Sequence, residues 1–292
     1  MLRDLRHACR VLLHAKGWTA VVLVSLALGI GANTAVFSAI NRLLIKQIPV
    51  EDPDGLVRLR WGGRNDAVTN SSDYGFSGTG SDGQRIRATF SYPMYQQLRA
   101  DNKTMTDLFA CAPAGRVNVV VDGQAEIATA FISTGNYYEV LGVSARLGRP
   151  IVPDDDRPDA PAVAVISSRY WHSRFMTEPG VLGKTIRVND VPMTIVGVLD
   201  PAFTGVQRTM SQPPDLAFPL SLDPRVNPRS GKRLADATSW WLQIMGRLRP
   251  GATAAQVDKD FAAAVFGIWL GPKPIQDDIK RGLVSRAPQA MP

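Results

Sequence analysis

The sequence predicts an α+β protein, in which a single N-terminal transmembrane helix precedes a mixed α/β domain with β-hairpins and short helices. Three observations lead to this prediction. An uncharged, mostly apolar stretch runs from Gly17 to Asn41. Two tight-turn dipeptides, Asp122-Gly123 and Asn189-Asp190, each separate a pair of strand-like runs rich in Val and Ile. Several short segments begin after Ser or Thr and end at Gly or Pro, as short helices do.

These signals divide the chain into four parts. Residues 1–16 are expected to form an amphipathic basic helix in the cytoplasm, and residues 17–45 the transmembrane helix. Residues 46–271 form the folded domain, and residues 272–292 a disordered tail. With 45% hydrophobic and 20% charged residues, the chain has the composition of a folded protein, so we expect a substantial core in the third part.

The apolar stretch is long enough to cross a bilayer. It has 25 residues, and a helical span needs roughly 20. Because backbone amides in hydrocarbon must pair within their own segment, such a span is helical. Basic residues before the stretch outnumber those just after it, which predicts a cytoplasmic N-terminus and an external domain. The expected anchors at the membrane interface are Arg6, Arg10, Lys16 and Trp18.

A cleaved signal peptide is the main alternative to a permanent span. The apolar core of a signal peptide has about 7–15 residues, which is shorter than this stretch. Small residues at Ala32, Ala35 and Ala39 nevertheless leave cleavage open. A buried helix of a soluble protein is disfavoured, because so long an uncharged run behind a basic start is unusual for a core helix.

Small residues recur at helical spacing within the span. Ser25 and Gly29 are four residues apart, as are Ala35 and Ala39. Such pairs let two helix backbones approach closely in lipid, and they are candidate membrane-helix packing positions. The same residues are also common in any membrane helix, so both interpretations remain open.

The first half of the folded domain shows several short elements. A strand is expected from Val57 to Trp61, followed by a Gly-, Ser- and Asn-rich loop over 62–85. Ser91 caps a helix that runs to about Ala100. The clearest hairpin pairs 116–121 with 124–133, because Asp-Gly supplies the positive φ angles of a type I′ turn.

Further elements follow in the second half. Thr134 is expected to cap a helix over 135–141 that ends at Gly142. A strand over 163–166 precedes a helix that opens at Ser167. The remaining elements are a hairpin over 185–198, a strand over 240–248, and a helix that starts with a Thr253/Gln256 capping box and turns Val257, Phe261, Val265 and Ile268 to one side.

The charge distribution argues against a nucleic-acid partner. The net charge is +7, but residues 1–16 hold four basic side chains against Asp4 alone. The remaining positive charge is spread along the rest of the chain, which has no basic helix, RNP-like aromatic motif or Cys/His finger.

Motifs for catalysis and cofactor binding are missing from the sequence. It contains no GxxxxGK[ST], G-x-S-x-G or HExxH pattern. His172 is the only histidine beyond the cytoplasmic helix, and a surface or packing role is the more common one for such a residue. Asp154–Asp156 and Asp159 lack the spacing, Gly and Glu of an EF-hand loop, so a solvated capping cluster is favoured. We predict no enzyme, no cofactor and no metal site.

The two cysteines add no chemistry. Cys9 and Cys111 lie on opposite sides of the predicted span, which argues against a disulfide between them. Two distant cysteines also make neither a zinc site nor a redox pair.

Particular segments of the sequence resemble a known family. They are FISTGNYYEVLGVSARLGRPIVPDDD (131–156), AVAVISSRYWHSRF (162–175), GVLGKTIRVNDVPMTIVGVLDPAFTGV (180–206), PDLAFPL (214–220) and LQIMGRLRPGATAAQ (242–256). These blocks resemble the MacB-like periplasmic core domain. The start of the chain resembles the first membrane helix of MacB/FtsX-type ABC transporter permeases, especially the acidobacterial duplicated orphan permeases.

This resemblance implies an architecture and partners. It implies a periplasmic core domain of two lobes over 46–271, an inner-membrane location, and three further membrane helices. A separate ABC ATPase subunit, a second permease copy, a periplasmic adaptor protein and membrane lipids are the implied partners, with no nucleic acid. The domain would couple ATP-driven motion to substrate or partner handling in transport such as efflux.

The sequence departs from the family at its C-terminal end. It stops at Pro292, after a tail that no longer resembles the family, and we interpret it as truncated before the later helices. Such a fragment is not expected to transport on its own. The alternative is a stand-alone, single-pass periplasmic binding or sensor module. In either case Tyr137, Tyr138, Trp171, Phe175 and Phe203 are expected to pack in the core.

Overall fold

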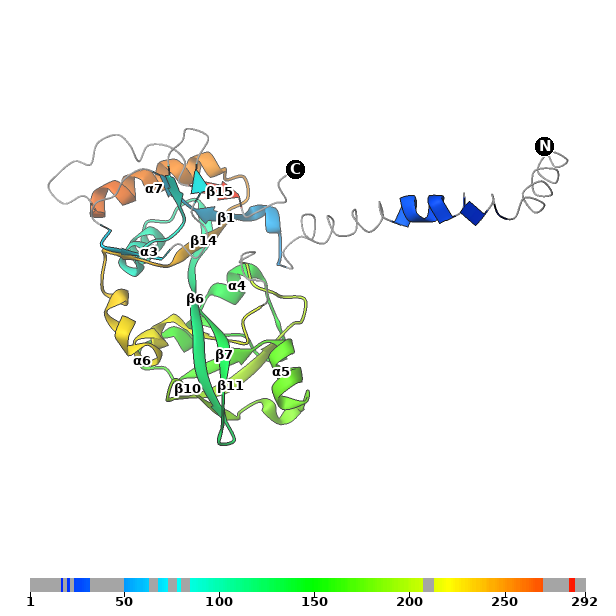
Figure 1. Cartoon of the computed structure of the whole chain (residues 1–292). Coiled ribbons are helices and arrows are strands. Elements are labelled where there is room, and N and C mark those ends of the chain that lie inside the picture. The colour runs from blue at the N-terminus through cyan, green and yellow to red at the C-terminus, as the bar shows by residue number, and fades with distance from the viewer. Residues whose placement is uncertain are drawn as a thin grey trace. The chain divides into compact units, whose positions relative to one another are not determined.

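The structure is a computed structural model that describes residues 17, 20–21, 24–31, 50–62, 68–72, 78–79, 85–206, 213–269 and 284–286 (Figure 1). The chain divides into two compact units, one formed by residues 1–47 and 288–292 and the other by residues 48–287. Each unit is described by itself.

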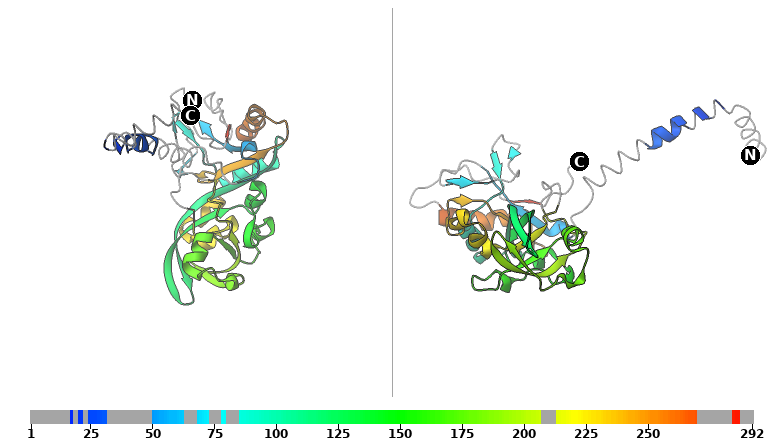
Figure 2. Two further views of the ribbon diagram at one scale, coloured as in Figure 1. Left: turned by 90° about the vertical axis from the view of Figure 1, so that its right-hand side faces the viewer. Right: turned by 60° about the horizontal axis from the view of Figure 1, so that its bottom comes forward.

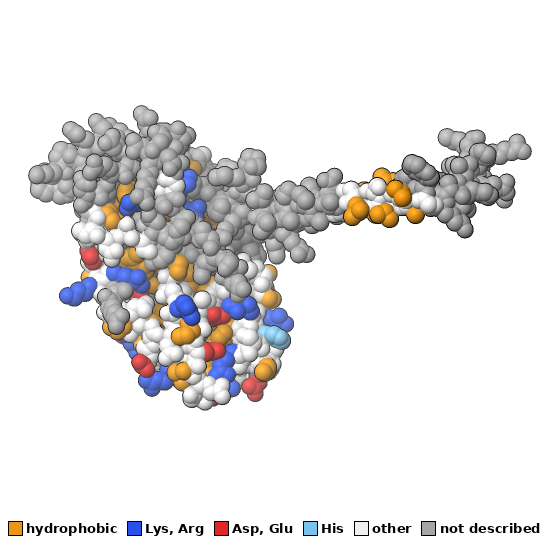
Figure 3. Space-filling view, viewed as in Figure 1, with side chains coloured by type: hydrophobic (Ala, Val, Ile, Leu, Met, Phe, Trp, Pro, Cys, Tyr) orange, Lys and Arg blue, Asp and Glu red, His pale blue; other side chains and the backbone are white. Residues whose placement is uncertain are grey.

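The described part of the first unit is helical. Residues 24–31 form a helical segment whose large apolar side chains are exposed, for example Leu28 at 68% and Ile30 at 64% (Figure 3). Among the described residues, no helix combines the length and apolar character needed to cross a membrane. The transmembrane helix over 17–45 therefore remains a prediction, and the amphipathic helix over 1–16 lies outside the described residues.

The second unit contains the mixed α/β fold that the sequence predicts. Its main sheet includes a closed ring of strands, in which each pairs with the next and β10 pairs again with β6. In order around the ring, the strands are β6 (Met105–Val121), β7 (Gln124–Ser133), β12 (Leu216–Pro219), β9 (Val163–Ile166), β11 (Val191–Leu199) and β10 (Thr185–Val188).

The long strand β6 joins this ring to the other end of the unit. Its first half pairs with β14 (Gln243–Leu248), which in turn pairs with β1 (Leu56–Leu59). Helices α3 (Tyr92–Ala100) and α7 (Ala254–Trp269) lie at the same end as β1 and β14, and Figures 1 and 2 show β6 running from there to the hairpin tip. Within the predicted tail, β15 (Val284–Arg286) pairs with β1, and the rest of the tail lies outside the described residues.

The remaining elements are short. The other strands are β2 (Trp61–Gly62), β3 (Asn70–Ser71), β4 (Gly78–Thr79), β5 (Arg85–Arg87), β8 (Ala145–Gly148) and β13 (Ser239–Trp240). The other helices are α4 (Tyr137–Leu141), α5 (Ser168–Phe175) and α6 (Asp223–Val226), with 3₁₀ turns η2 (Pro53–Gly55), η3 (Pro153–Asp156), η4 (Pro179–Val181), η5 (Leu220–Leu222) and η6 (Pro228–Leu234). The strand predicted over 240–248 is thus divided between β13 and β14.

Both predicted hairpins are confirmed. Asp122 and Gly123 have φ angles of 51° and 79°, as a type I′ turn requires. The first strand of this hairpin is longer than predicted, because β6 already begins at Met105. Pro113 and Gly115 interrupt the sequence signal, since both residues are poor strand formers, and the structure accommodates them at a register shift between β6 and β7.

Three of the four predicted helix caps are confirmed. The hydroxyls of Ser91 and Ser167 accept hydrogen bonds from backbone amides three residues ahead, and Thr253 and Gln256 form the reciprocal pair of a capping box. Thr134 is not a side-chain cap. Helix α4 begins only at Tyr137, its N-cap is Asn136, and the Thr134 hydroxyl is used elsewhere.

The core holds the five aromatic residues that were predicted to pack there. Tyr137 and Tyr138 are each 1% exposed, and Trp171, Phe175 and Phe203 are also buried. Tyr137 contacts Phe109 and Tyr138 edge-on, with ring centroids 5.0 Å and 4.9 Å away. Such edge-to-face pairs add directional packing to the burial of apolar area, so α4 is held firmly by rings from several elements.

Candidate functional site

Two of the predicted membrane-helix packing positions lie among the described residues. Ser25 and Gly29 lie in the described helical segment, and a Cβ placed on Gly29 would meet no atom within 4 Å. Ala35, Ala39, Arg6, Arg10, Lys16 and Trp18 lie outside the described residues. Helix packing and interface anchoring therefore stay predictions.

The histidine and the acidic residues considered for catalysis or metal binding do not form such a site among the described residues. His172 is exposed on α5, and its Nδ1 lies 3.2 Å from the Thr177 hydroxyl. Within the described ranges, no three His, Cys, Asp or Glu side chains gather in a way that could hold a metal ion. Lys, Arg, Asp and Glu side chains are interspersed on the described surface in Figure 3.

The acidic run at Asp154–Asp156 is less solvated than predicted. Asp154 is exposed, but Asp155 is 8% exposed and pairs with the Arg149 guanidinium. Hydrogen bonds from that guanidinium and from the Val152 amide lower the pKa of Asp155, although burial alone would raise it. Within this run, Asp155 is therefore a buried hydrogen-bond acceptor, while Asp154 is exposed.

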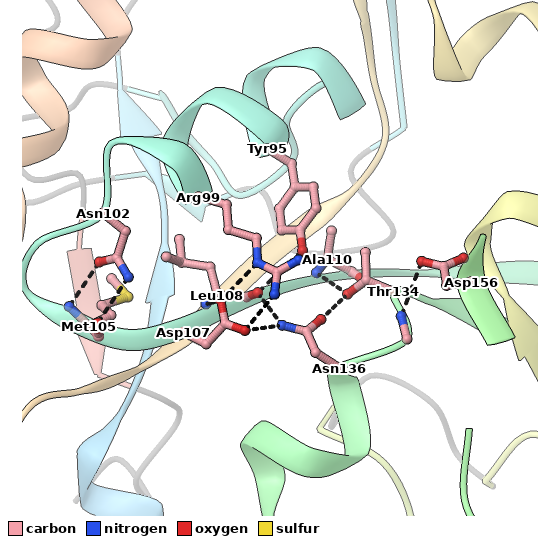
Figure 4. Close-up of polar contacts among 11 residues, drawn as sticks. Tyr95, Arg99, Asn102, Met105, Asp107, Leu108, Ala110, Thr134, Asn136 and Asp156 are labelled. Carbon is pink, nitrogen blue, oxygen red and sulfur yellow. Dashed lines mark hydrogen bonds and ion pairs between the residues drawn. The ribbon is translucent and has the colours of Figure 1, made fainter. Parts of the chain in front are cut away.

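A polar cluster stands out where β6 meets α3 and the start of α4. We call it the polar joint, and it comprises Arg99, Asp107, Thr134, Asn136 and Asp156 (Figure 4). Arg99 comes from α3, Asp107 from the first half of β6, and Thr134 and Asn136 from the link between β7 and α4. Asp156 ends η3. Residues from four segments of the chain thus gather in one cluster.

An ion pair forms one side of the polar joint. The Arg99 guanidinium donates two hydrogen bonds to Asp107, at 2.8 Å to Oδ1 and 2.7 Å to Oδ2. The Leu108 amide donates to the same carboxylate. Burial alone would raise the pKa of Asp107, but the bonds from Arg99, Asn136 and Leu108 together lower it. Asp107 is thus held as a carboxylate, fixed to α3 by a two-pronged contact.

Asn136 lies at the centre of the polar joint and is only 3% exposed. Its side-chain nitrogen lies 2.7 Å from both Asp107 Oδ2 and the Leu108 carbonyl, and it donates to each. Its Oδ1 accepts a hydrogen bond from the Thr134 hydroxyl at 2.8 Å. The amide therefore has partners on both sides, as a buried polar group requires.

Thr134 connects the same link to β6. Its hydroxyl accepts from the Ala110 amide at 3.1 Å, and its own amide donates to the Ala110 carbonyl at 2.9 Å. Nearby, the Tyr95 hydroxyl donates to the Leu108 carbonyl. Burial raises the pKa of Tyr95 to about 12, so the hydroxyl keeps its proton and remains a donor. These contacts explain why Thr134 does not cap α4.

Asp156, the fifth member of the polar joint, is held beside the backbone of Gly135. A Cβ on Gly135 would lie 2.6 Å from the Pro153 Cα, so only glycine permits η3 to approach this closely. Asp156 accepts hydrogen bonds from the Gly135 amide at 3.1 Å and the Ser221 amide at 2.8 Å. Burial raises the pKa of Asp156 even though these amide bonds oppose the shift. The start of α4 is thereby tied to η3 and η5 as well as to β6.

The polar joint connects secondary-structure elements by hydrogen bonds. Its members satisfy one another, and none presents a nucleophile beside a base. Sequence reasoning did not find it, because its members come from helix end, strand and loop and match no local motif. The one usable signal was the run Ser133-Thr134-Gly135-Asn136, where small polar residues separate a strand from a helix.

Comparison with known proteins identifies the family of this chain. The family model of the MacB-like periplasmic core domain matches residues 19–264. The chain belongs to that family. The folded unit is therefore a MacB-like periplasmic core domain. No curated protein matches the chain.

Two solved structures show the same fold at low sequence identity. The first is a domain of a protein described as a permease from Porphyromonas gingivalis. It has 15% sequence identity and a TM-score of 0.51, and the match covers 74% of this chain and 82% of that chain. The second is the periplasmic region of MacB from Actinobacillus actinomycetemcomitans. It has 14% sequence identity and a TM-score of 0.50, and the match covers 77% of this chain and 87% of that chain. At such low sequence identity, the likeness shows a shared fold and nothing more.

Proposed function

We propose that this chain is the membrane-anchored periplasmic portion of an ABC transporter permease, which couples the motion of a separate ATPase to periplasmic substrate or partner handling. In this proposal the domain acts by changing position or shape and carries out no catalysis. The N-terminal stretch anchors it in the inner membrane with the N-terminus in the cytoplasm.

The family match is the observation that carries the proposal. The matched region begins at residue 19, inside the apolar stretch, and continues through the folded domain to residue 264. The stretch and the domain are thus parts of one family pattern. The exposed Val, Leu and Ile side chains of residues 24–31 give further support, because a surface of this kind suits a hydrocarbon surrounding.

A pair of reporter fusions tests the anchoring. Alkaline phosphatase and green fluorescent protein would each be fused after Pro292 in a Gram-negative host, and the membranes would be extracted with carbonate. We expect the product to stay in the membrane, with an active phosphatase and a dark fluorescent protein. A fluorescent fusion, a soluble product, or a mature N-terminus near residue 40 would contradict the proposal.

The partner prediction needs a separate test. The protein would be affinity-purified from its native membranes after cross-linking, and the co-purifying proteins identified by mass spectrometry. We expect an ABC ATPase and a second permease chain. Recovery of the chain with neither of them would instead favour the stand-alone sensor module.

A further inference from the structure

A second polar cluster fixes the beginning of the folded unit. It joins Glu51 and Asp52, which follow the apolar stretch, to Val140 and Leu141 at the end of α4 through Arg247 of β14. We call these five residues the α4 clamp. Its contacts connect positions that are up to 196 residues apart in the chain.

Arg247 is the centre of the α4 clamp. Its Nε donates to the Val140 carbonyl at 3.0 Å, its Nη1 to the Asp52 carbonyl at 2.8 Å, and its Nη2 to the Glu51 carbonyl. The side chain is 16% exposed. A cation that binds the last carbonyls of a helix also interacts favourably with the helix dipole. One guanidinium therefore holds the start of the unit and the end of α4 together.

Two further contacts reinforce the α4 clamp. The Glu51 amide donates to the Leu141 carbonyl at 3.0 Å. Gly142, which ends α4 with a φ of +68°, lies so close to Glu51 that a Cβ on it would be 2.5 Å from the Glu51 Cβ. Gly142 thus serves both the left-handed helix end and the approach of residue 51.

Helix α4 lies between the α4 clamp and the polar joint. Asn136, at its start, belongs to the polar joint, and Val140 and Leu141, at its end, belong to the α4 clamp. The helix has only five residues, and the rings of Tyr137 and Tyr138 are packed against Phe109 and Phe203. A short helix fixed at both ends and packed along its length moves as one piece.

We infer that α4 is the element that carries displacement of the chain at Glu51 into β6, with Arg247 as the positioning residue that attaches it. This inference rests on the proposed function, because it assumes that the membrane segment delivers movement at that point. The polar joint then passes the displacement to β6 and α3 through Asn136 and Asp107.

Hydrogen exchange of the full chain in detergent tests the inference. In Arg247→Ala, we expect the Glu51 amide to exchange at least about tenfold faster, since loss of about 1.4 kcal/mol of local stability corresponds to a factor of ten. The amides of Tyr137 and Val140, which donate to the Thr134 and Asn136 carbonyls, should also exchange faster. A contact of merely local importance would affect Glu51 alone.

Arg249→Ala is the matched control. Arg249 follows β14 and donates through Nε to the Met105 carbonyl at 3.0 Å, but among the described residues it forms no hydrogen bond with residues 51–52 or with α4. We expect unchanged exchange at Glu51, Tyr137 and Val140 in this variant. Arg247→Lys keeps the charge without the planar fork, so it should fold and show an intermediate rate.

The outcomes separate this inference from the proposed function. Unchanged exchange at Tyr137 and Val140 in both Arg247 variants, or equal acceleration in Arg249→Ala, would overturn the role of α4. The reporter fusions and the partner purification do not depend on Arg247, so their failure would overturn the proposed function instead.

Discussion

The two halves of β6 are held in different ways. Near its start, the backbone of β6 pairs with β14, and Asp107, Leu108 and Ala110 are in addition bound by side chains from α3 and from the link before α4. Toward its end, Val117–Val121 pair through the backbone with β7 and, at Val119 and Val120, with β10. Alternate apolar side chains of that second half are buried in the core.

The difference predicts how sensitive each half is to substitution. A backbone ladder in a closed ring leaves few unpaired groups and resists single substitutions. A side-chain network depends on each member, because the loss of one leaves the others unsatisfied. We therefore expect the first half of β6, whose attachment to α3 and α4 depends on side chains, to lose more stability on single substitutions than the half within the ring.

The largest effect is expected from Asn136→Ala. The change removes three hydrogen bonds, to Asp107 Oδ2, to the Leu108 carbonyl and from the Thr134 hydroxyl, although each of these groups keeps a second partner. A hydrogen bond contributes about 0.5–1.5 kcal/mol, and more when one partner is charged, so a loss of about 3 kcal/mol in the free energy of unfolding is expected. Urea denaturation followed by tryptophan fluorescence would measure it.

Asn118→Ala is the control from the second half of β6. Asn118 is exposed, and its recorded contacts with Asn189 use the backbone of Asn118. The change should lower the free energy of unfolding by under about 0.5 kcal/mol, as for most surface substitutions. Equal losses in the two asparagine variants would remove the contrast between the halves.

Gly135→Ala should have the next largest effect. Its Cβ would meet Pro153 Cα and the Val152 carbonyl, at 2.6 Å and 2.7 Å, so η3 would have to move away from the polar joint. We expect a loss of about 2 kcal/mol, within the range for overpacking. Gly115→Ala in β6 meets no neighbour, and at a φ of +81° it should cost about 1 kcal/mol through backbone strain alone. A smaller loss in Gly135→Ala than in Gly115→Ala would contradict the close packing at η3.

A smaller effect, with a pH dependence, is expected from Arg99→Gln. Because the pKa of Asp107 is lowered in the folded state, its ion pair contributes stability above the ordinary value of 3.8. That contribution is lost as the pH falls through the folded pKa, which lies below this value. Since the Arg99 side chain is 45% exposed, we expect a loss of about 1 kcal/mol at pH 7 that shrinks as the pH falls below 3.8 and through the folded pKa.

Urea denaturation at pH 7 and at a pH below 3.8 would measure this dependence. Arg187→Gln breaks the exposed pair with Asp190 near the second half of β6, where both side chains are more than half exposed. It should change stability little at either pH. A penalty in Arg99→Gln that stayed constant with pH would mean that Asp107 does not titrate as described.

The smallest effect is expected from Ile127→Thr. Ile127 lies on β7 opposite Asn118 and is 57% exposed. Threonine keeps the β-branched shape that suits a strand, so the free energy of unfolding should change by under about 0.5 kcal/mol. A loss above 1 kcal/mol would show that the far end of the hairpin depends on side chains, against the comparison made above.

Local signals in the sequence were enough to predict much of the fold. Asp122-Gly123 marked a hairpin, Ser91 and Ser167 marked helix starts, and Gly142 marked a helix end, because each position is fixed by the conformation of adjacent residues. The first half of β6 was missed, since Pro113 and Gly115 obscure the strand pattern.

The polar joint and the α4 clamp could not be predicted in the same way. Asn136 binds Asp107 across 29 residues and Arg247 binds Glu51 across 196 residues, and no spacing rule links such positions. Thr134 illustrates the limit, because its local context suggested a helix cap while a distant strand determined its partner. Tertiary contacts decide the roles of these side chains.

A double-mutant cycle on Asn136 and Arg247 tests the connection through α4 most directly. The two side chains hold opposite ends of α4, and they have no recorded contact with each other. If α4 moves as one piece, freeing one end weakens the other, and the double alanine variant should lose less stability than the sum of the single variants by more than about 0.5 kcal/mol. Additivity within about 0.3 kcal/mol would show that the two ends are independent and would contradict the account.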